Sequence, residues 1–314
     1  MLQRTRVATT GCKLSNFARR SLAWTVLIPF VAATLAGCSG GVIQPQGPIA
    51  SANAIILLDA VGIMAVIVVP TIAAVLGCAW WYRASNTRAQ YLPHFVYSGR
   101  LELLVWAIPL LVITFLGGVI WVGAHQLDPF RPIPAQQKPM EVQVISLDWK
   151  WLFIYPEQGI ASVNELVVPA GRTVHFSLTS ASVMNMFFVP QLGSMVATMN
   201  GMVTQLHLRA DHPGDYYGQS SQYSGNGFSG MHFVMRAVQQ AEVDRWIAAA
   251  RASGPALDRA GYGELAKQSQ DVKPFTYRAI DPNLFKAVAR LDIAPAPGPA
   301  ASSASAESRP QGRH

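Results

Sequence analysis

Residues 140–180 read MEVQVISLDWKWLFIYPEQGIASVNELVVPAGRTVHFSLTS. Short runs rich in Val, Ile, Phe and Thr alternate here with Pro, Gly and Asn. Runs of this length, bounded by turn-forming residues, are typical of β-strands rather than helices. The strands that we predict in this stretch are 141–147, 151–155, 165–168 and 173–179.

The same pattern continues beyond this stretch, with further predicted strands at 184–189, 204–208 and 231–237. About seven short strands in roughly a hundred residues are typical of a Greek-key β-sandwich, which we place at 140–238.

A helical region is predicted after the sandwich, at 239–292. Val243, Trp246, Ile247 and Ala250 recur at helical spacing, and Gly254-Pro255 ends that helix. Asp281-Pro282 resembles the start of a last helix that runs to Leu291. The Ala/Pro/Ser-rich tail, 293–314, has too little apolar surface to fold, and we expect it to be disordered.

Two apolar spans precede the sandwich. Residues 54–81 contain one charge, Asp59, and residues 102–122 contain only Glu102, at their start. Each span is long enough to cross a bilayer as a helix. Together with the sandwich they predict a membrane-anchored α+β protein with a transmembrane hairpin.

The loop between the spans indicates their orientation. Trp80-Trp81-Tyr82 are typical of a membrane interface, and Arg83, Arg88 and Arg100 follow without any acidic residue. Short basic loops stay in the cytoplasm, so we expect everything after residue 123 to lie on the outer side. For a bacterial inner-membrane protein this is the periplasm.

The N-terminus resembles an export signal. A basic stretch precedes an apolar run and then Leu35-Ala36-Gly37-Cys38, which resembles the bacterial lipobox. We predict a signal peptide at 1–37 and a lipid-modified Cys38 as the mature N-terminus of a segment at 38–123. An ordinary signal peptide with an incidental cysteine is the alternative. The exported part contains no cysteine that could form a disulfide.

Composition excludes one class of function. The chain is 51% hydrophobic and 13% charged, and five of its seven net positive charges lie in the leader. The remaining balance is nearly neutral, so the charge gives no reason to expect a nucleic-acid partner.

Several motifs, in this order, resemble subunit II of the haem–copper respiratory oxidases. They are WYRASN, LDWKWLFIYPEQGIASVNELVVPAG, SVMNMFFVPQLGS and YSGNGFSGMHF. Within that superfamily they look like the quinol oxidase branch of the cytochrome bo type. The resemblance extends from the lipobox to about residue 290. It implies a cupredoxin-like sandwich and a proton-translocating complex that oxidises ubiquinol with O2.

The resemblance also locates a former copper site. In the cytochrome c oxidases this subunit holds two copper ions with a His, a Cys-x-x-x-Cys pair, a Glu carbonyl, a second His and a Met. We match this set to Asn185, Ser220, Gln222, Ser224, His232 and Met235. The last pair, which begins at His232, lies eight residues after Ser224, whereas the family has four residues at this point.

These residues cannot form the dinuclear centre, because bridging thiolates hold the two copper ions and serine hydroxyls are poor ligands. A mononuclear site at His232 and Met235 is an alternative with too few ligands. We favour a solvated His232 and a Met235 packed in the sandwich. The subunit family then implies no redox metal in this chain, with haem and copper in subunit I.

Other residues have two interpretations each. Five methionines could bind copper through thioether sulfur, but we favour docking against the catalytic subunit; they are Met184, Met186, Met195, Met199 and Met202. Trp149 matches an electron-relay position, but packing is favoured in the absence of copper. Glu102 either lies at the mouth of a proton path into subunit I, as the family implies, or pairs with Arg100. Asp59 could face a partner helix or interfacial water.

We therefore expect subunit II of a bacterial quinol oxidase, an anchoring subunit with subunits I, III and IV as partners. Two other interpretations remain open. One is a copper-binding subunit II of a cytochrome c oxidase, and the other is an independent periplasmic copper-binding lipoprotein. Co-purification with haem-bearing partners distinguishes a subunit from an independent binder.

The lipobox yields a first prediction. Replacing Cys38 with Ser removes the lipid, while the chain stays in the membrane fraction because transmembrane helices anchor more firmly than acyl chains. Mass spectrometry of the mature N-terminus, with fractionation as the control, tests this. An unmodified N-terminus in the natural sequence would contradict it.

Overall fold

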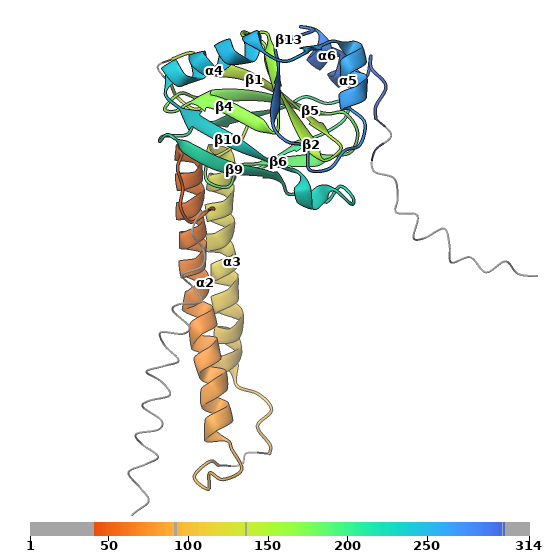
Figure 1. The fold of residues 1–314 in the computed structure, drawn as a ribbon. Coiled ribbons are helices and arrows are strands. Elements are labelled where there is room, and N and C mark those ends of the chain that lie inside the picture. Colours follow the sequence, from red (N-terminus) through yellow and green to blue (C-terminus); the bar gives the residue numbers. More distant parts are fainter. Residues whose placement is uncertain (1–40, 91–92, 136, 297, 299–314) are drawn as a thin grey trace, which may run out of the picture. The chain divides into compact units, whose positions relative to one another are not determined.

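The computed structural model describes residues 41–90, 93–135, 137–296 and 298. The chain divides into two compact units, Met1–Gln44 and Pro45–His314. The predicted signal peptide, Cys38 and the tail beyond residue 298 lie outside the described residues. The second unit contains both long helices and the sandwich (Figure 1).

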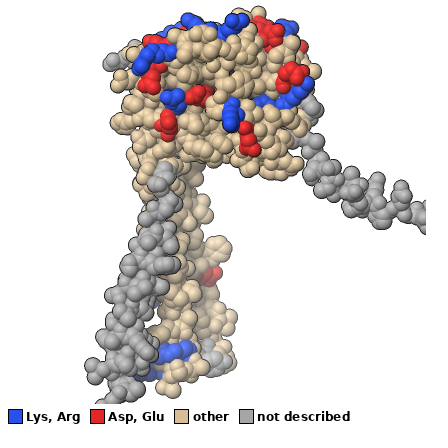
Figure 2. All heavy atoms as spheres, viewed as in Figure 1, with Lys and Arg blue, Asp and Glu red and all other residues tan. Residues whose placement is uncertain are grey.

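Two long helices begin the described chain: α2 (Pro48–Trp81) and α3 (Gly99–Gln126). Both are long and apolar enough to cross a membrane. Both helices extend beyond the predicted spans, because apolar sequence marks only the part of a helix that lies in hydrocarbon. The earlier start of α2 coincides with a proline in its first turn, a position that favours proline. Figure 2 shows uncharged surface along most of the pair and basic side chains at the end away from the sandwich.

The start of α2 contacts the sandwich through its backbone. The Gln46 amide donates to the carbonyl oxygen of Gln191 at 2.8 Å, and the Asp211 amide donates to the Gln46 carbonyl at 2.9 Å. A Cβ atom on Gly47 would lie 2.2 Å from the carbonyl oxygen of Arg209, so this close approach requires glycine. The first helix is therefore attached to the β8–β9 side of the domain.

The first sheet of the sandwich has the order β12-β3-β2-β1-β5-β8. Its strands β1 and β2 form a tight hairpin, and β1 also pairs in parallel with β5. The strands are β1 (Met140–Leu147), β2 (Lys150–Tyr155), β3 (Ile160–Val163), β5 (Val174–Ser180), β8 (Thr204–Leu208) and β12 (Phe275–Tyr277).

The second sheet has the order β4-β10-β9-β6-β7. Here β10 pairs in parallel with β4 and antiparallel with β9. The strands are β4 (Glu165–Pro169), β6 (Asn185–Phe188), β7 (Val196–Thr198), β9 (Gly214–Ser220) and β10 (His232–Val238).

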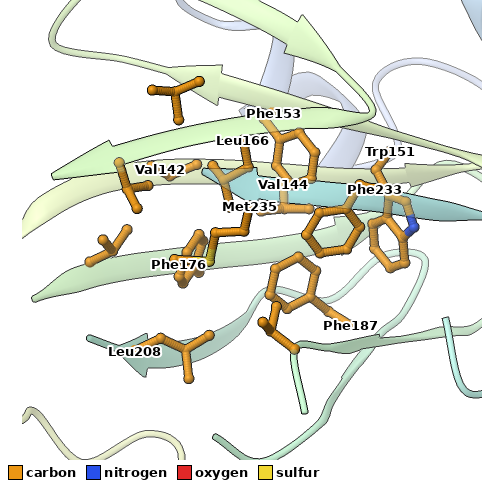
Figure 3. Packing of buried hydrophobic residues seen from close by; sticks show 14 of the residues in the cluster. Val142, Val144, Trp151, Phe153, Leu166, Phe176, Phe187, Leu208, Phe233 and Met235 are labelled. Carbon is orange, nitrogen blue, oxygen red and sulfur yellow. The ribbon is translucent and has the colours of Figure 1, made fainter. Parts of the chain in front are cut away.

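Aromatic side chains fill the space between the sheets (Figure 3). The ring of Phe187 stacks on Phe233 with centroids 5.1 Å apart, and it meets Trp151 edge-on at 5.4 Å. All three are almost completely buried. Burying such rings is the largest apolar contribution available to a domain of this size, and offset or edge-on contacts add to it.

The C-terminal segment consists of α4 (Gln240–Ala252), β11 (Ala256–Leu257), α5 (Arg259–Leu265), β12, β13 (Ala279–Ile280) and α6 (Leu284–Ala289). In this segment, α4 packs on the core between the sheets next to β4, whereas α5 and α6 pack against the outer face of the first sheet. The predicted face of α4 is confirmed for Val243, Ile247 and Ala250, which are buried. The family fold predicted from the motifs, a helical hairpin followed by a sandwich and C-terminal helices, is the observed one.

The last helix is shorter than predicted. Asp281 does not cap it; its carboxylate accepts the Asn283 amide at 2.9 Å in a turn, and the helix starts at Leu284. Ordered contacts also continue past residue 293, since the Ala296 amide donates to the Ala181 carbonyl at 2.9 Å. The boundary of the predicted tail therefore lies later than residue 293.

Candidate metal centre

Asn185 and Ser220, two of the former copper-ligand positions, lie together on neighbouring strands. Ser220 ends β9 and pairs with Phe187 of β6, which begins at Asn185. The Ser220 hydroxyl donates to the Asn185 side-chain oxygen at 3.2 Å, and both residues are buried. The hydroxyl of Thr198 donates to the Asn185 carbonyl at 3.2 Å and lies 2.7 Å from the Ser146 hydroxyl. Hydroxyl and amide groups thus bind one another where a metal centre would need ligands.

Gln222 and Ser224 belong to the loop that follows. The carbonyl oxygen of Gln222 lies 3.3 Å from the Ser220 hydroxyl. Ser224 is buried, and its hydroxyl lies 4.0 Å from the sulfur of Met231. Three of the predicted positions, Asn185, Ser220 and Gln222, are therefore in contact, whereas Ser224 contacts Met231 and Trp149.

His232 and Met235 are not part of that group. His232 is exposed at the start of β10, where its ring stacks on Tyr217 with centroids 5.8 Å apart. Met235 is fully buried in the core between the sheets (Figure 3). The exposure of His232 and the burial of Met235 confirm the favoured interpretations, a solvated histidine and a methionine packed in the sandwich.

The four-residue spacing of the family pattern, counted from Ser224, leads instead to Phe228 and then Met231 for the last two positions. They lie four and seven residues after Ser224, and Met231 is the methionine whose sulfur is near the Ser224 hydroxyl. Sequence reasoning missed them because a His-x-x-Met pair occurs nearby and Phe228 is no ligand. The four-residue spacing alone would have identified both.

Trp149 closes the other side of this loop. Its indole nitrogen donates to the Ser224 carbonyl at 2.9 Å, and its side chain is buried. A Cβ on Gly227 would lie 2.3 Å from the Trp149 ring, so the loop lies directly against the indole. The favoured packing role of Trp149 is thus the observed one.

Lys150 connects the same turn to the C-terminal segment. Its ammonium donates to the Lys267 carbonyl at 2.6 Å and to the Ser269 hydroxyl at 2.5 Å. Burial lowers the pKa of Lys150 to about 8, an effect that the nearby Asp148 partly opposes. Asn164 makes a parallel connection, since its side-chain nitrogen donates to the Val272 carbonyl at 2.7 Å.

The residues at this site do not fit a dinuclear copper centre. The donors are hydroxyl, amide and carbonyl groups with one thioether, whereas that centre needs two bridging thiolates and imidazole nitrogen. Among the described residues no group of three or more His, Cys, Asp or Glu side chains could hold a metal ion. The loop is organised by hydrogen bonds and packing.

Two family models match the chain. Cytochrome C oxidase subunit II, periplasmic domain, covers residues 157–238, and the COX Aromatic Rich Motif covers residues 251–290. The cytochrome bo(3) ubiquinol oxidase subunit 2 of Pseudomonas aeruginosa is 44% identical over 87% of this chain and 81% of its own length. The chain belongs to the cytochrome bo(3)-type ubiquinol oxidase subunit 2 family.

A second relative belongs to the same family. The ubiquinol oxidase subunit 2 of Acetobacter aceti is 45% identical over 81% of this chain and 83% of its own length. Among solved structures, the periplasmic domain of subunit II of cytochrome oxidase (CoxB) of Bradyrhizobium japonicum is similar over 38% of this chain and 98% of its own, with 24% identity and a TM-score of 0.35.

Other predicted residues lie away from this loop or at its rim. Glu102 is exposed in the first turn of α3, and no ion pair with Arg100 occurs in the described part of the chain. Met195 lies at the rim, where the Ser221 hydroxyl is 3.5 Å from its sulfur. Of the five methionines predicted to dock on a partner, the substantially exposed ones are Met184, Met195 and Met202.

The position of Met231 predicts how copper binding can be restored. The natural chain incubated with copper should give no mixed-valence signal in electron paramagnetic resonance, because it has no thiolate at the loop. Combining Asn185→His, Ser220→Cys, Gln222→Glu, Ser224→Cys and Phe228→His should give that signal. The same set without Phe228→His should give no such signal, because His232 is then the only histidine available after the two new cysteines. A signal from that protein would mean that His232, and not residue 228, occupies the position of the second histidine ligand.

The lowered pKa of Lys150 predicts a pH dependence of stability. Between about pH 8 and the ordinary lysine pKa the unfolded chain binds a proton that the folded chain has lost, so the free energy of unfolding should rise with pH there. Lys150→Met should reduce this rise, whereas exposed Lys286→Met should leave it unchanged. Pulse proteolysis in urea on the full-length chain measures it, and equal slopes in all three proteins would contradict the prediction.

Proposed function

We propose that this chain is subunit II of a proton-translocating quinol oxidase and carries no redox metal of its own. The observation that carries the proposal is the loop at 220–231, in which Ser220 and the Ser224 carbonyl form hydrogen bonds with Asn185 and Trp149 and no thiolate is present. The family relationship supports ubiquinol as the electron donor, since relatives at 42–45% identity are named ubiquinol oxidase subunits.

The type of donor explains why no copper is needed here. Soluble cytochrome c delivers electrons from the aqueous side and needs a relay in the exported domain. Quinol dissolves in the bilayer and can reduce a partner subunit within it. We place the haems, the remaining copper and the oxygen chemistry in subunit I, and we expect subunits III and IV in the complex.

In this proposal the chain anchors and braces subunit I. The two apolar helices have almost no buried side chains within the chain, so neighbouring helices and lipid are needed to cover them. Met184, Met195 and Met202 expose flexible thioether side chains that suit an irregular protein surface. We propose that these methionines dock on the catalytic subunit.

The proposed location is the bacterial inner membrane. The signal peptide, the lipid on Cys38 and two membrane passes would place the sandwich in the periplasm and the loop around Arg83 and Arg88 in the cytoplasm. Glu102 would then start α3 at the cytoplasmic side, where we propose that its carboxyl collects protons for subunit I. Its exposed position without an ion pair to Arg100 supports that role.

Purification tests the proposal directly. The chain, carried with an affinity tag, should bring haem-bearing partners with it, and the purified complex should oxidise ubiquinol but not reduced cytochrome c. Rates are normalised to haem. Oxidation of cytochrome c alone would favour the cytochrome c oxidase alternative, and recovery of the chain without haem would favour an independent lipoprotein.

The role of Glu102 predicts a difference between two substitutions. Glu102→Gln should slow quinol oxidation more than Glu102→Asp, because an amide keeps the size but cannot titrate. Haem content should be unchanged in both. Steady-state activity per haem is the measurement, with Glu242→Gln on the sandwich side as control. Full activity of Glu102→Gln would leave Glu102 as a structural residue.

A further inference from the structure

A polar cavity of about 550 Å³ lies on the sandwich domain beside the linker that follows α3. One wall comes from the linker that follows α3, with Pro134, Ala135 and Gln137. Another contains Arg209, whose carbonyl oxygen lies against Gly47 at the start of α2. The cavity is separate from the loop at 220–231, and its lining includes none of that loop's residues.

Two arginines line this cavity, and each is oriented by its Nε atom. The Nε of Arg172 donates to the Lys138 carbonyl at 2.9 Å, and the Nε of Arg209 donates to Asp211 at 2.7 Å. The terminal nitrogens of both guanidiniums make no hydrogen bond with another described residue. Planar guanidinium groups with free N–H donors match the geometry of a phosphate group.

A buried hydroxyl supplies an independent indication of a ligand. Thr173 lines the cavity and is 1% exposed, yet its Oγ1 atom has no hydrogen-bond partner among the described residues. An unpaired buried hydroxyl costs free energy, so such a group is normally satisfied by water, an ion or a ligand.

The N-terminus of α4 adds further donors. Gln240, its first residue, lines the cavity, and the helix has 13 residues and no side-chain cap at Gln239. The Glu242 amide already donates to the Gln239 carbonyl at 2.9 Å, so the amides of Gln240 and Ala241 are the donors that remain for an anion, which the helix dipole favours there.

Nearby carboxylates pair with two of the cations around the cavity and leave Arg172 without an ion pair among the described residues. Asp211 neutralises part of Arg209, and Glu157 is bound to Lys138 at 2.7 Å. Arg172 has no carboxylate within ion-pair distance in the described part of the chain. Arg172, Arg209 and Lys138 are balanced in number by Asp211, Glu157 and Glu141, so Arg172 is the cation left to bind an anion directly.

We propose that this cavity binds a phosphate group through Arg172, Arg209, the Thr173 hydroxyl and the start of α4. The ligand is a phosphate monoester or diester, because a lone phosphate fills only part of the volume. Two sources share this chemistry. One is the headgroup of an anionic phospholipid in the outer leaflet. The other is a free phosphorylated solute.

The test uses the full-length chain in the purified complex. In nonionic detergent, isothermal titration with inorganic phosphate is performed at constant ionic strength, with chloride as the balancing anion. In a second arm, the complex is reconstituted into nanodiscs of phosphatidylcholine with or without about 30% phosphatidylglycerol. The lipid that stays bound to the complex is then measured by native mass spectrometry. The 30% figure is about the anionic content needed for a clear contrast with neutral lipid.

The variants are Arg172→Gln, Arg209→Gln and Thr173→Val, and Arg245→Gln is the matched control on the exposed side of α4. Each arginine substitution should weaken binding by about tenfold or more, since a hydrogen bond to a charged group is lost. Thr173→Val should weaken binding without lowering stability, because its hydroxyl has no partner in the protein. Arg245→Gln should bind as the natural chain does.

Saturable binding of inorganic phosphate that these variants weaken supports the site and a soluble source. Retained phosphatidylglycerol that is lost in Arg172→Gln but kept in Arg245→Gln supports the site and a lipid source. If neither ligand binds above the chloride background, or if the control loses binding as the cavity variants do, the proposal is overturned. Quinol oxidase activity is not a readout, so this result is independent of the function proposed above.

Discussion

The backbone of Trp149 is the constraint on which the neighbouring parts of the structure depend. Its φ of +64° lies in the left-handed region, which is unfavourable for a bulky residue and typically costs about 1–3 kcal/mol. This conformation turns β1 directly into β2, with Leu147 paired to Lys150. It also directs the indole toward the loop at 220–231 and lets Lys150 reach the C-terminal segment. The hydrogen bond to Ser224 and the contact with Gly227 hold the strained turn in place.

That arrangement explains how the loop at 220–231 can be held in place by protein groups alone. A metal centre would fix the loop through strong bonds to several side chains. Here Ser220 and Asn185 satisfy each other, and Trp149 satisfies the Ser224 carbonyl. Each of these bonds contributes about 0.5–1.5 kcal/mol, but leaving any of the buried groups unpaired would cost more. Several weak interactions, supported by the aromatic core around Phe187, therefore maintain a surface that the proposed partner can recognise.

Much of this fold could be predicted from local sequence patterns. The apolar helices and strands such as β1 and β8 are recognisable because burial selects residues with a simple period. Strand β9 was missed because its sequence, GDYYGQS, contains two glycines and few apolar residues. Gly218 lies there because the Phe233 ring occupies the space where a side chain would be, with a Cβ only 2.2 Å from it. Such a requirement depends on the partner strand and has no local signature.

The former ligand positions were partly predictable for a related reason. Asn185, Ser220, Gln222 and Ser224 followed from spacing, whereas His232 and Met235 were chosen for their chemistry. Side chains alternate along β10, so His232 faces solvent and Met235 faces the core, and the two cannot bind the same metal ion. The cavity around Arg172 and Arg209 had no sequence signal at all, because its residues come from segments that only the fold brings together.

The position of Asp59 follows from the length of α2. With Trp81 at the cytoplasmic interface, as proposed, Asp59 lies 22 residues earlier, or about 33 Å along the helix. The hydrocarbon layer is about 30 Å thick, so the carboxylate reaches its outer boundary instead of its centre. Gln126, the last residue of α3, lines the same groove as Asp59. A charge that appears to interrupt the apolar span is thus placed where headgroups and water can solvate it. The remaining eleven residues of α2 before Asp59 extend outward to Pro48 and the contacts with the sandwich.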